Sequence, residues 1–222
     1  MRARLQLFAS ALALVLWLPG CRVERPPYGG EKESALATAT IAVDLGAVTR
    51  LLAAGANPNQ MVPVNGRQQS PWFLSLYLLR KNRPDMVQMI EAMLKAGASP
   101  NQAWGTMSDV KAPQESFWQR FMNHTRSAGT GSNSPLDLVV LFHPVPAVVR
   151  ALMAAGANPR YGATALVSAV EGRDTEVVHI LVDAGVDVNI QAGANTPLLA
   201  AVEARDVGLM TYLEEHGARE KP

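Results

Sequence analysis

The stretch LLAAGANPN, residues 51–59, decides the fold because close variants of it return along the chain. These variants are MLKAGASPN at 93–101, LMAAGANP at 152–159, LVDAGVDVN at 181–189 and LEEHGA at 213–218. Of the five stretches, the first four are largely apolar helical segments followed by Gly, and the fifth is a shorter, more polar one that also reaches Gly. Glycine supplies the left-handed conformation that closes many helices and that other residues resist. The stretches therefore predict helices that end at Gly55, Gly97, Gly156, Gly185 and Gly217.

A second pattern lies upstream of each glycine. It begins at Ser34, Ser70, Ser134, Thr164 and Thr196, and continues with Ala or Pro and a large apolar residue. The Ser or Thr precedes its glycine by 21 residues in three cases, by 22 for Ser134 and by 27 for Ser70. A Ser or Thr can cap a helix whose first turn accepts Pro. The two patterns predict pairs of helices that stack, because one pair alone cannot bury both of its faces.

These paired patterns resemble the ankyrin repeat over most of residues 34–218. The resemblance implies an all-α solenoid of about five helix-turn-helix repeats. It would span residues 34–222, with one large insertion, residues 103–133, between the second and third repeats. An irregular helical bundle with Ala-Gly turns is the alternative. The resemblance also implies that the array binds another protein.

By the same resemblance, a partner protein contacts the hairpin tips and the concave side of the first helix of each pair. The equivalent positions are Arg67, Gln69, Arg160, Tyr161 and Asn195 before the Ser or Thr pattern, and Tyr77, Phe142, Glu171 and Glu203 after it. These side chains are polar, charged and aromatic, a mixture that suits a specific protein interface. The alternative is an ordinary solvated surface.

Three departures from the repeat predict local differences. Residues 79–84 (LRKNRP) predict a lengthened first helix or a longer turn in the second repeat. The prolines of HPVP at 143–146 predict an early end of the first helix in the third repeat. In the fifth repeat Glu214, Glu215 and His216 predict a C-terminal cap with a polar outer face.

The insertion at 103–133 contains QESFWQRFMNH, residues 114–124, which can form an amphipathic helix. Trp104, Phe117 and Trp118 are candidate partner contacts, since buried aromatic side chains are frequent anchors of protein interfaces. The alternative is that these aromatic residues cover core that the interrupted stacking leaves exposed.

The N-terminus has the three parts of a secretory signal. Arg2 and Arg4 precede an apolar run at residues 5–18, which is shorter than the roughly 20 residues that span a bilayer. The run ends in LPGC, residues 18–21, which resembles the lipobox of bacterial lipoproteins except at Pro19. The resemblance implies a signal peptide at 1–20 and acylation of Cys21, for example by palmitate. An ordinary secretory signal, or an anchor helix with an incidental cysteine, is the alternative.

Residues 21–33 are predicted to be the lipidated cysteine and a flexible tether with Pro and Gly pairs. Arg22 in place of Asp favours, by resemblance to enterobacterial lipoproteins, the outer membrane over the inner one. The protein is thus expected to be lipid-anchored in the bacterial cell envelope and to face the periplasm.

The sequence lacks the residue patterns of catalysis, cofactor binding and metal binding that we sought. It has neither a Gly-x-Ser-x-Gly elbow nor a phosphate-binding Gly-x-x-x-x-Gly-Lys, and its four histidines form no two-His helical pair. The chain has 20 basic and 19 acidic residues, or 18 and 19 without residues 1–20, so its charge gives no case for nucleic acid.

The sequence therefore predicts a non-enzymatic module that binds another protein beside the membrane. A concrete form of this hypothesis is an immunity protein, or inhibitor, that captures a toxic effector such as a lipase. The alternative is a periplasmic scaffold or accessory factor for a stress-response enzyme. An enzyme that uses the insertion is a third hypothesis.

Overall fold

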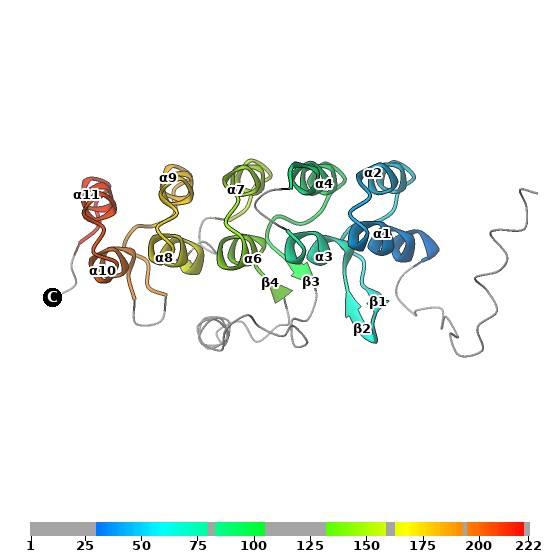
Figure 1. Ribbon diagram of the computed structural model, residues 1–222, viewed down its shortest axis with the longest axis horizontal. Helices are drawn as coiled ribbons and strands as arrows, with labels where there is room; N and C mark the ends of the chain where they lie inside the picture. Colours follow the sequence, from blue (N-terminus) through cyan, green and yellow to red (C-terminus); the bar gives the residue numbers. More distant parts are fainter. Residues whose placement is uncertain (1–29, 80–82, 105–131, 159–162, 193–194, 220–222) are drawn as a thin grey trace, which may run out of the picture.

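The computed structural model describes residues 30–79, 83–104, 132–158, 163–192 and 195–219. Within these residues the helices form pairs, with the first helix in an inner layer and the second in an outer layer (Figure 1). The inner helices are α1 (Glu31–Ile41), α3 (Pro71–Tyr77), α6 (Pro135–Phe142), α8 (Ala163–Glu171) and α10 (Pro197–Glu203). The outer helices are α2 (Leu45–Ala53), α4 (Pro84–Lys95), α7 (Pro146–Ala154), α9 (Thr175–Asp183) and α11 (Val207–Glu215). The pairs stand in one row, which confirms the predicted all-α solenoid of five repeats.

In three repeats the inner helix begins, as predicted, at a Ser or Thr whose hydroxyl group caps it. These side-chain oxygens accept the backbone N–H three residues later, in the pairs Ser70 with Phe73 at 3.1 Å, Ser134 with Asp137 at 3.4 Å and Thr196 with Leu199 at 3.2 Å. Proline follows the cap in all three, at a position where a helix does not need the missing N–H.

The first repeat begins differently from the prediction. α1 starts at Glu31, so Ser34 lies inside the helix instead of capping it. The backbone N–H of Gly30 donates to the Glu33 carboxylate at 3.0 Å, and this contact satisfies the start of the helix. Residues 31–33, which the sequence assigned to the tether, are therefore helical. In the fourth repeat Thr164 likewise lies inside α8.

The five predicted glycines follow the outer helices and close them. Gly55, Gly97, Gly156, Gly185 and Gly217 have φ of 84°, 91°, 90°, 86° and 93°. In each case the backbone N–H of the next residue donates back to a carbonyl near the end of the helix, at 2.9 or 3.0 Å. A side chain at these positions would strain the left-handed backbone, so the glycines fix where each outer helix stops.

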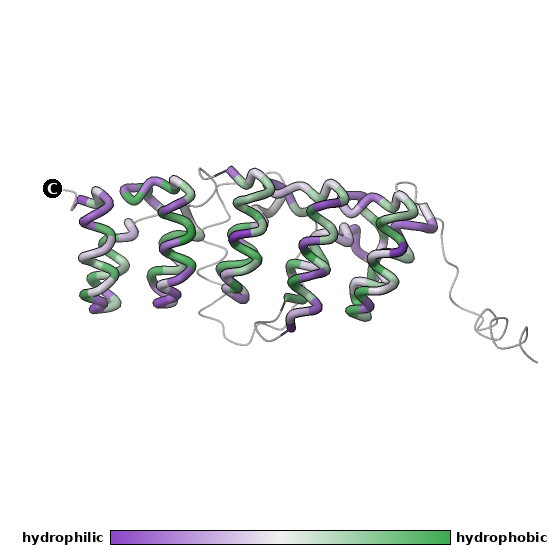
Figure 2. The backbone as a smooth tube through the Cα atoms, turned by 90° about the horizontal axis from the view of Figure 1, so that it is seen from above, coloured by the Kyte–Doolittle hydropathy of each residue, from purple (hydrophilic) through white to green (hydrophobic). Residues whose placement is uncertain are grey.

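The hydrophobic core runs between the two layers from the first repeat to the last. Leu36, Ile90, Leu152, Leu166 and Leu181, which come from both layers, are fully buried in it. Figure 2 shows that hydropathy changes within the helices, so that they have a polar side and an apolar side. Each pair thus covers its neighbour, as expected for stacked repeats.

The first, fourth and fifth repeats join inner to outer helix by a three-residue turn. Its middle residue is left-handed, with φ of 55° at Val43, 56° at Arg173 and 52° at Arg205. The third repeat has Pro144 at this position, and proline cannot adopt a positive φ. α6 therefore ends at Phe142, His143 has φ −151°, and Pro146 begins α7. With 8 residues, against 7 in α3 and in α10, α6 is not shortened, so the predicted early end is wrong and the prolines change only the turn.

The extra residues of the second repeat are shared between its turn and its outer helix. α3 has 7 residues and ends at Tyr77, so the inner helix is not lengthened. α4 has 12 residues, against 9 in α2, and residues 78–83 separate α3 from α4. Of the two predicted forms, the longer turn is confirmed and the longer inner helix is wrong.

Two short antiparallel hairpins extend from the inner layer, away from the outer helices (Figure 1). β1 (Val62–Val64) pairs with β2 (Arg67–Gln69) across Asn65 and Gly66, both of which have the positive φ that a tight hairpin turn requires. β3 (Ala103–Trp104) pairs with β4 (Ser132–Asn133). The two ends of the predicted insertion are thus neighbours, while the predicted helix at 114–124 lies outside the described residues.

Candidate protein-binding surface

The predicted contacts on the first hairpin lie on β2. Arg67 is opposite Val64 and Gln69 is opposite Val62, and both polar side chains are half-buried. Val62 itself is buried in a small apolar cluster with Ala37 of α1 and Leu74 of α3. This cluster holds the hairpin against the first two inner helices.

Two predicted residues of the C-terminal repeats contact each other. Glu171, the last residue of α8, accepts a hydrogen bond from Asn195 Nδ2 at 3.2 Å. Asn195 belongs to the loop before α10, where its backbone forms a bridge with Ala192. The pair therefore links the end of one inner helix to the loop that enters the next, and both side chains are half-buried.

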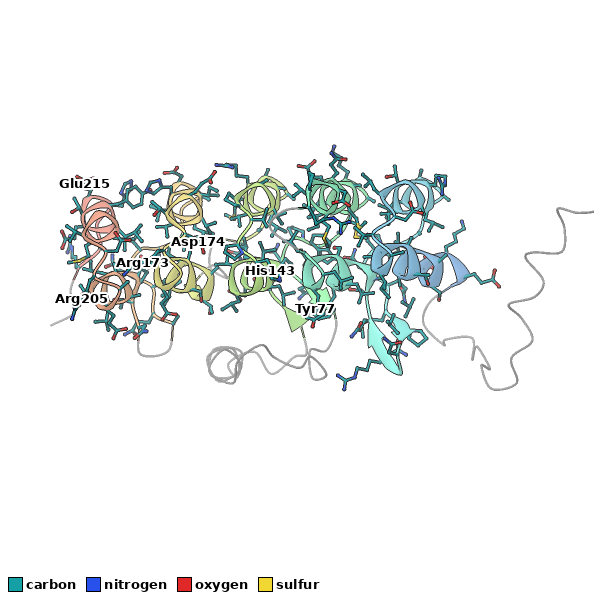
Figure 3. All side chains as sticks on the ribbon, in the orientation of Figure 1. Tyr77, His143, Arg173, Asp174, Arg205 and Glu215 are labelled. Atoms are coloured by element: carbon teal, nitrogen blue, oxygen red, sulfur yellow. The ribbon has the colours of Figure 1, made fainter. Side chains whose placement is uncertain are left out.

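Tyr77 and Glu203 occupy the same repeat position as Glu171, at the ends of α3 and α10. The Tyr77 ring stacks on Phe73, with centroids 5.8 Å apart and an interplanar angle of 7°, which fixes its orientation. Figure 3 shows Tyr77 below α3, on the side of the hairpins. Glu203 is exposed. These residues form a row along the inner layer.

The structure places the backbone of two further predicted contacts. Trp104 lies in β3 opposite Ser132, and Phe142 is the last residue of α6. The other predicted residues, Cys21, Phe117, Trp118, Arg160 and Tyr161, lie outside the described residues, and their roles stay predictions.

Three asparagines that sequence reasoning missed connect successive repeats. Asn59, Asn101 and Asn189 each close one copy of the recurring stretch, and this recurrence was the signal that could have found them. Their amide nitrogens donate to the carbonyls of Gly97, Gly156 and Gly217 in the next repeat, at 2.8, 3.2 and 2.9 Å. Their amide oxygens accept the backbone N–H of Ser99, Asn158 and Arg219, at 2.9, 2.6 and 2.9 Å. Each asparagine thus satisfies a carbonyl at a helix end and ties two repeats together.

The junction between the third and fourth repeats has a different residue at this position. The sequence places Arg160 where the other stretches have asparagine. A guanidinium group has donors only, so it cannot accept the backbone N–H that the asparagine oxygen accepts. This junction therefore cannot form the two-sided bridge of the others.

Asp137 of α6 lies at the same junction and faces α8. Its Oδ1 is buried and has no hydrogen-bond partner among the described residues. Burial raises the pKa of Asp137 to about 7, against the opposing effect of the Ala165 backbone N–H and the Ser134 hydroxyl. The equivalent position holds Ala37, Phe73 or Val167 in other repeats, so this carboxyl occupies an otherwise apolar place.

The charges of the array are divided between its two ends. Residues 30–162 contain twelve basic and eight acidic residues, whereas residues 163–219 contain three basic and nine acidic ones. The last two repeats therefore carry a negative surface potential, which favours the approach of basic molecules.

The groups on the inner surface are hydrogen-bonding and aromatic side chains, which suit the recognition of another protein. In the part of the chain that the structure describes, no three His, Cys, Asp or Glu side chains are grouped so that they could hold a metal ion. Within the same ranges, no helix has the length and apolar character that crossing a membrane requires.

Comparison with known proteins identifies the fold. Residues 137–221 match the family model for ankyrin repeats, which comprises three copies. Among solved structures, the ankyrin repeat domain of human ASB11 is similar, with a TM-score of 0.55 and 23% sequence identity over 83% of this chain and 69% of that one. No curated protein matches the sequence. The chain has the ankyrin-repeat fold.

Proposed function

We propose that this protein is a non-enzymatic module that binds another protein through the hairpin side of its inner helices. The proposal rests on the row of Tyr77, Glu171 and Glu203, which occupy one repeat position at the ends of three inner helices. The stacking on Phe73 and the hydrogen bond from Asn195 hold two of these side chains in place before a partner arrives. Binding then costs less side-chain entropy than it would on a mobile surface.

The same proposal places the module at a membrane, on the bacterial cell envelope and facing the periplasm. The support is the LPGC stretch that ends at Cys21, with Arg22 favouring the outer membrane. Two or three acyl chains on one cysteine give stable anchoring, at about 0.8 kcal/mol per buried CH₂ group. Because α1 begins at Glu31, the ten residues from Cys21 to Gly30 would allow the array to reach about 35 Å from the lipid.

The partner that this arrangement suits is a toxic protein delivered into the periplasm, such as a lipase, and the module would act as its immunity protein. Capture by a rigid surface without a catalytic group is sufficient for that role. Cells that lack the gene and meet the neighbouring toxin gene product should die. Unchanged survival, together with co-purification of a stress-response enzyme, would favour the scaffold hypothesis instead.

The binding surface can be tested with purified residues 22–222. We expect Tyr77→Ala and Glu171→Ala together to weaken partner capture at least about tenfold, because they remove two members of the row. Arg50→Ala with Lys95→Ala is the matched control, since both residues are exposed on outer helices. If the control variant loses the partner while the Tyr77 and Glu171 variant keeps it, the hairpin side is not the binding surface.

The membrane anchor can be tested separately with Cys21→Ser in the full-length chain. The wild-type protein should sediment with membranes and incorporate labelled palmitate, and the variant should do neither. A variant that still sediments would contradict the lipid anchor without affecting the proposed binding surface.

A further inference from the structure

The inner helices have two positions that consistently face the next repeat, three and six residues after the Ser or Thr. At the first position Ala37, Phe73 and Val167 are 2%, 1% and 0% exposed. At the second position Thr40, Leu76, Val140 and Val170 are 1%, 1%, 4% and 0% exposed. They are buried because each inner helix packs against the following one, from α1 and α3 to α8 and α10.

The last inner helix keeps apolar residues at both positions but leaves them uncovered. Leu199 and Val202 of α10 are equivalent to Val167 and Val170, yet they are 42% and 39% exposed. Figure 1 shows α10 and α11 at the end of the row, opposite the end formed by α1 and α2. Among the described residues, no further helix stacks on α10.

The outer helix of the last repeat is only partly apolar at its stacking positions. The position seven residues before the closing glycine is fully buried in the first four outer helices, where it holds Val48, Ile90, Val149 and Val178. In α11 this position holds Met210, which is only half-buried. The position three residues before the closing glycine is apolar and partly buried in the first four outer helices, as Leu52, Leu94, Met153 and Val182. In α11 the same position holds Glu214, which is exposed. The polar residues predicted to cap the array, Glu214, Glu215 and His216, are exposed at the end of α11, whereas α10, for which no polar cap was predicted, keeps apolar residues at its stacking positions.

Acidic groups border this uncovered surface. Glu203, Glu214 and Glu215 are exposed, and Figure 3 shows Glu215 on the last helix, at the end of the row. The last repeat has four acidic residues against Arg205 and Arg219. An apolar patch with a negative border favours a partner that is apolar at its centre and basic around it.

We propose that Leu199, Val202 and Met210, with Glu214 and Glu215 at their border, form an end face that docks a basic helix with an apolar stripe from a partner protein. This end face is a second surface, beyond the hairpin side of the proposed function. The stripe would continue the stacking that joins α8 to α10, with the incoming helix in the place of a further inner helix. Basic side chains beside the stripe would pair with the acidic border.

A second copy of this chain that presents the same end is a poorer occupant, because both ends carry the same acidic border and would repel. The opposite end exposes Ile41 and Lys32 of α1 beside Glu31, Ala35 and Thr38. A second copy stacked head to tail is therefore the competing occupant, and the sedimentation experiment below distinguishes it from a partner helix.

The test uses residues 22–222 and a synthetic peptide of Leu and Lys, about 18 residues long, with leucines at helical spacing. A peptide of the same composition with scrambled order is the control for charge alone. Fluorescence anisotropy should show saturable binding of the first peptide, weakened at least about tenfold by Leu199→Ser with Val202→Ser. Glu214→Gln with Glu215→Gln should weaken binding mainly at low salt.

Two control variants keep the result specific. Ile41→Ser removes an apolar side chain that is 46% exposed on α1, at the other end of the array, and should leave binding unchanged. Tyr77→Ala should also leave it unchanged, because Tyr77 lies on the hairpin side. The thermal midpoint of each variant is measured beside its affinity, and binding is compared at a temperature at which all variants are folded, because Tyr77 is half-buried and its loss costs stability.

Four outcomes would overturn the proposal. The first is equal affinity for the ordered and scrambled peptides, and the second is no binding of the ordered one. The third is loss of peptide binding in Tyr77→Ala, which would move the peptide to the hairpin side. The fourth is self-association in sedimentation that Leu199→Ser with Val202→Ser abolishes, which would assign the end face to a second copy. None of these outcomes decides whether the hairpin side binds a protein, so the two proposals fail separately.

Discussion

The junction between the third and fourth repeats and the junction between the fourth and fifth are built from equivalent helices, yet they differ at two positions. In the second of these junctions, Val167 is fully buried under α10 and Asn189 bridges to Gly217 and Arg219. In the first, Asp137 occupies the place of Val167 and Arg160 occupies the place of Asn189.

This difference shows that stability in a solenoid is set junction by junction. Each repeat contacts only its neighbours, so a buried carboxyl or a missing bridge weakens one interface and leaves the others intact. The junction between α6 and α8 also separates a basic part, which carries both two-stranded sheets, from an acidic part. We expect local opening to occur first at this boundary.

Replacing Asp137 should have the largest effect. The pKa of Asp137 is about 7 in the folded chain against an ordinary 3.8, so the folded state holds this proton more tightly than the unfolded state. Stability should therefore fall as the pH rises from about 4 to about 7, by at most about 4 kcal/mol, and stay level above that. Asp137→Asn cannot ionise and should remove this loss.

Urea unfolding of both proteins at about pH 4 and about pH 8 measures the difference. The two should be similar in acid, and Asp137→Asn should be more stable at the higher pH. Parallel pH profiles would show that the carboxyl does not set this junction's stability. The two proteins differ only at residue 137, so the comparison isolates the effect of this carboxyl.

Removing an existing bridge should have the next largest effect. Asn101→Ala leaves the Gly156 carbonyl and the Asn158 backbone N–H without their side-chain partner. The expected loss is about 1–3 kcal/mol in urea unfolding. Asn189→Ala should cost a similar amount, because its contacts are equivalent. A change below about 0.3 kcal/mol in both would mean that water replaces the bridge at no cost.

Supplying the missing bridge should have a smaller and opposite effect. Arg160→Asn restores the residue type that ties the other junctions, and should add about 1 kcal/mol. Hydrogen exchange of the Asp187 backbone N–H should slow in the variant, since this group is equivalent to the N–H of Ser99. Unchanged exchange would show that the loop at 159–162 does not bring the new amide into position.

The smallest effect should come from the ion pair that crosses the weak junction. Arg150 Nη2 lies 2.6 Å from Glu176 Oε1, but the two side chains are 56% and 60% exposed. Arg150→Ala should therefore cost less than about 1 kcal/mol, and nothing measurable at high salt. A larger loss that persists at high salt would indicate that Arg150 contributes packing instead of charge.

The sequence predicted the features of the fold that depend on a single residue in its own repeat. The five closing glycines and the caps at Ser70, Ser134 and Thr196 are examples, because their chemistry is local. The resemblance implied a hairpin near Arg67 and Gln69, but its turn at Asn65-Gly66, a strong signal for a tight hairpin, was missed. The early start of α1 was missed because Glu33, not the hydroxyl of Ser34, satisfies the helix end.

Features that depend on a neighbouring repeat could not be predicted in the same way. The bridge from Asn59 and the burial of Asp137 appear only when the next repeat is in place. The exposure of Leu199 and Val202 likewise depends on whether another helix stacks on α10. The presence of apolar residues at these positions does not indicate whether such a helix is there. For the candidate surface, the sequence identified Glu171 and Asn195 separately, and the structure brings them together.

β3 and β4 hold the two ends of residues 105–131 side by side, through the pairs Ala103 with Asn133 and Trp104 with Ser132. The packing of the repeats therefore does not depend on how many residues lie between β3 and β4. Doubling that number would cost only about 0.6 kcal/mol of loop-closure entropy. Natural selection can exchange, lengthen or rewrite this segment as a cassette while the repeats stay as they are, and a protein engineer can do the same.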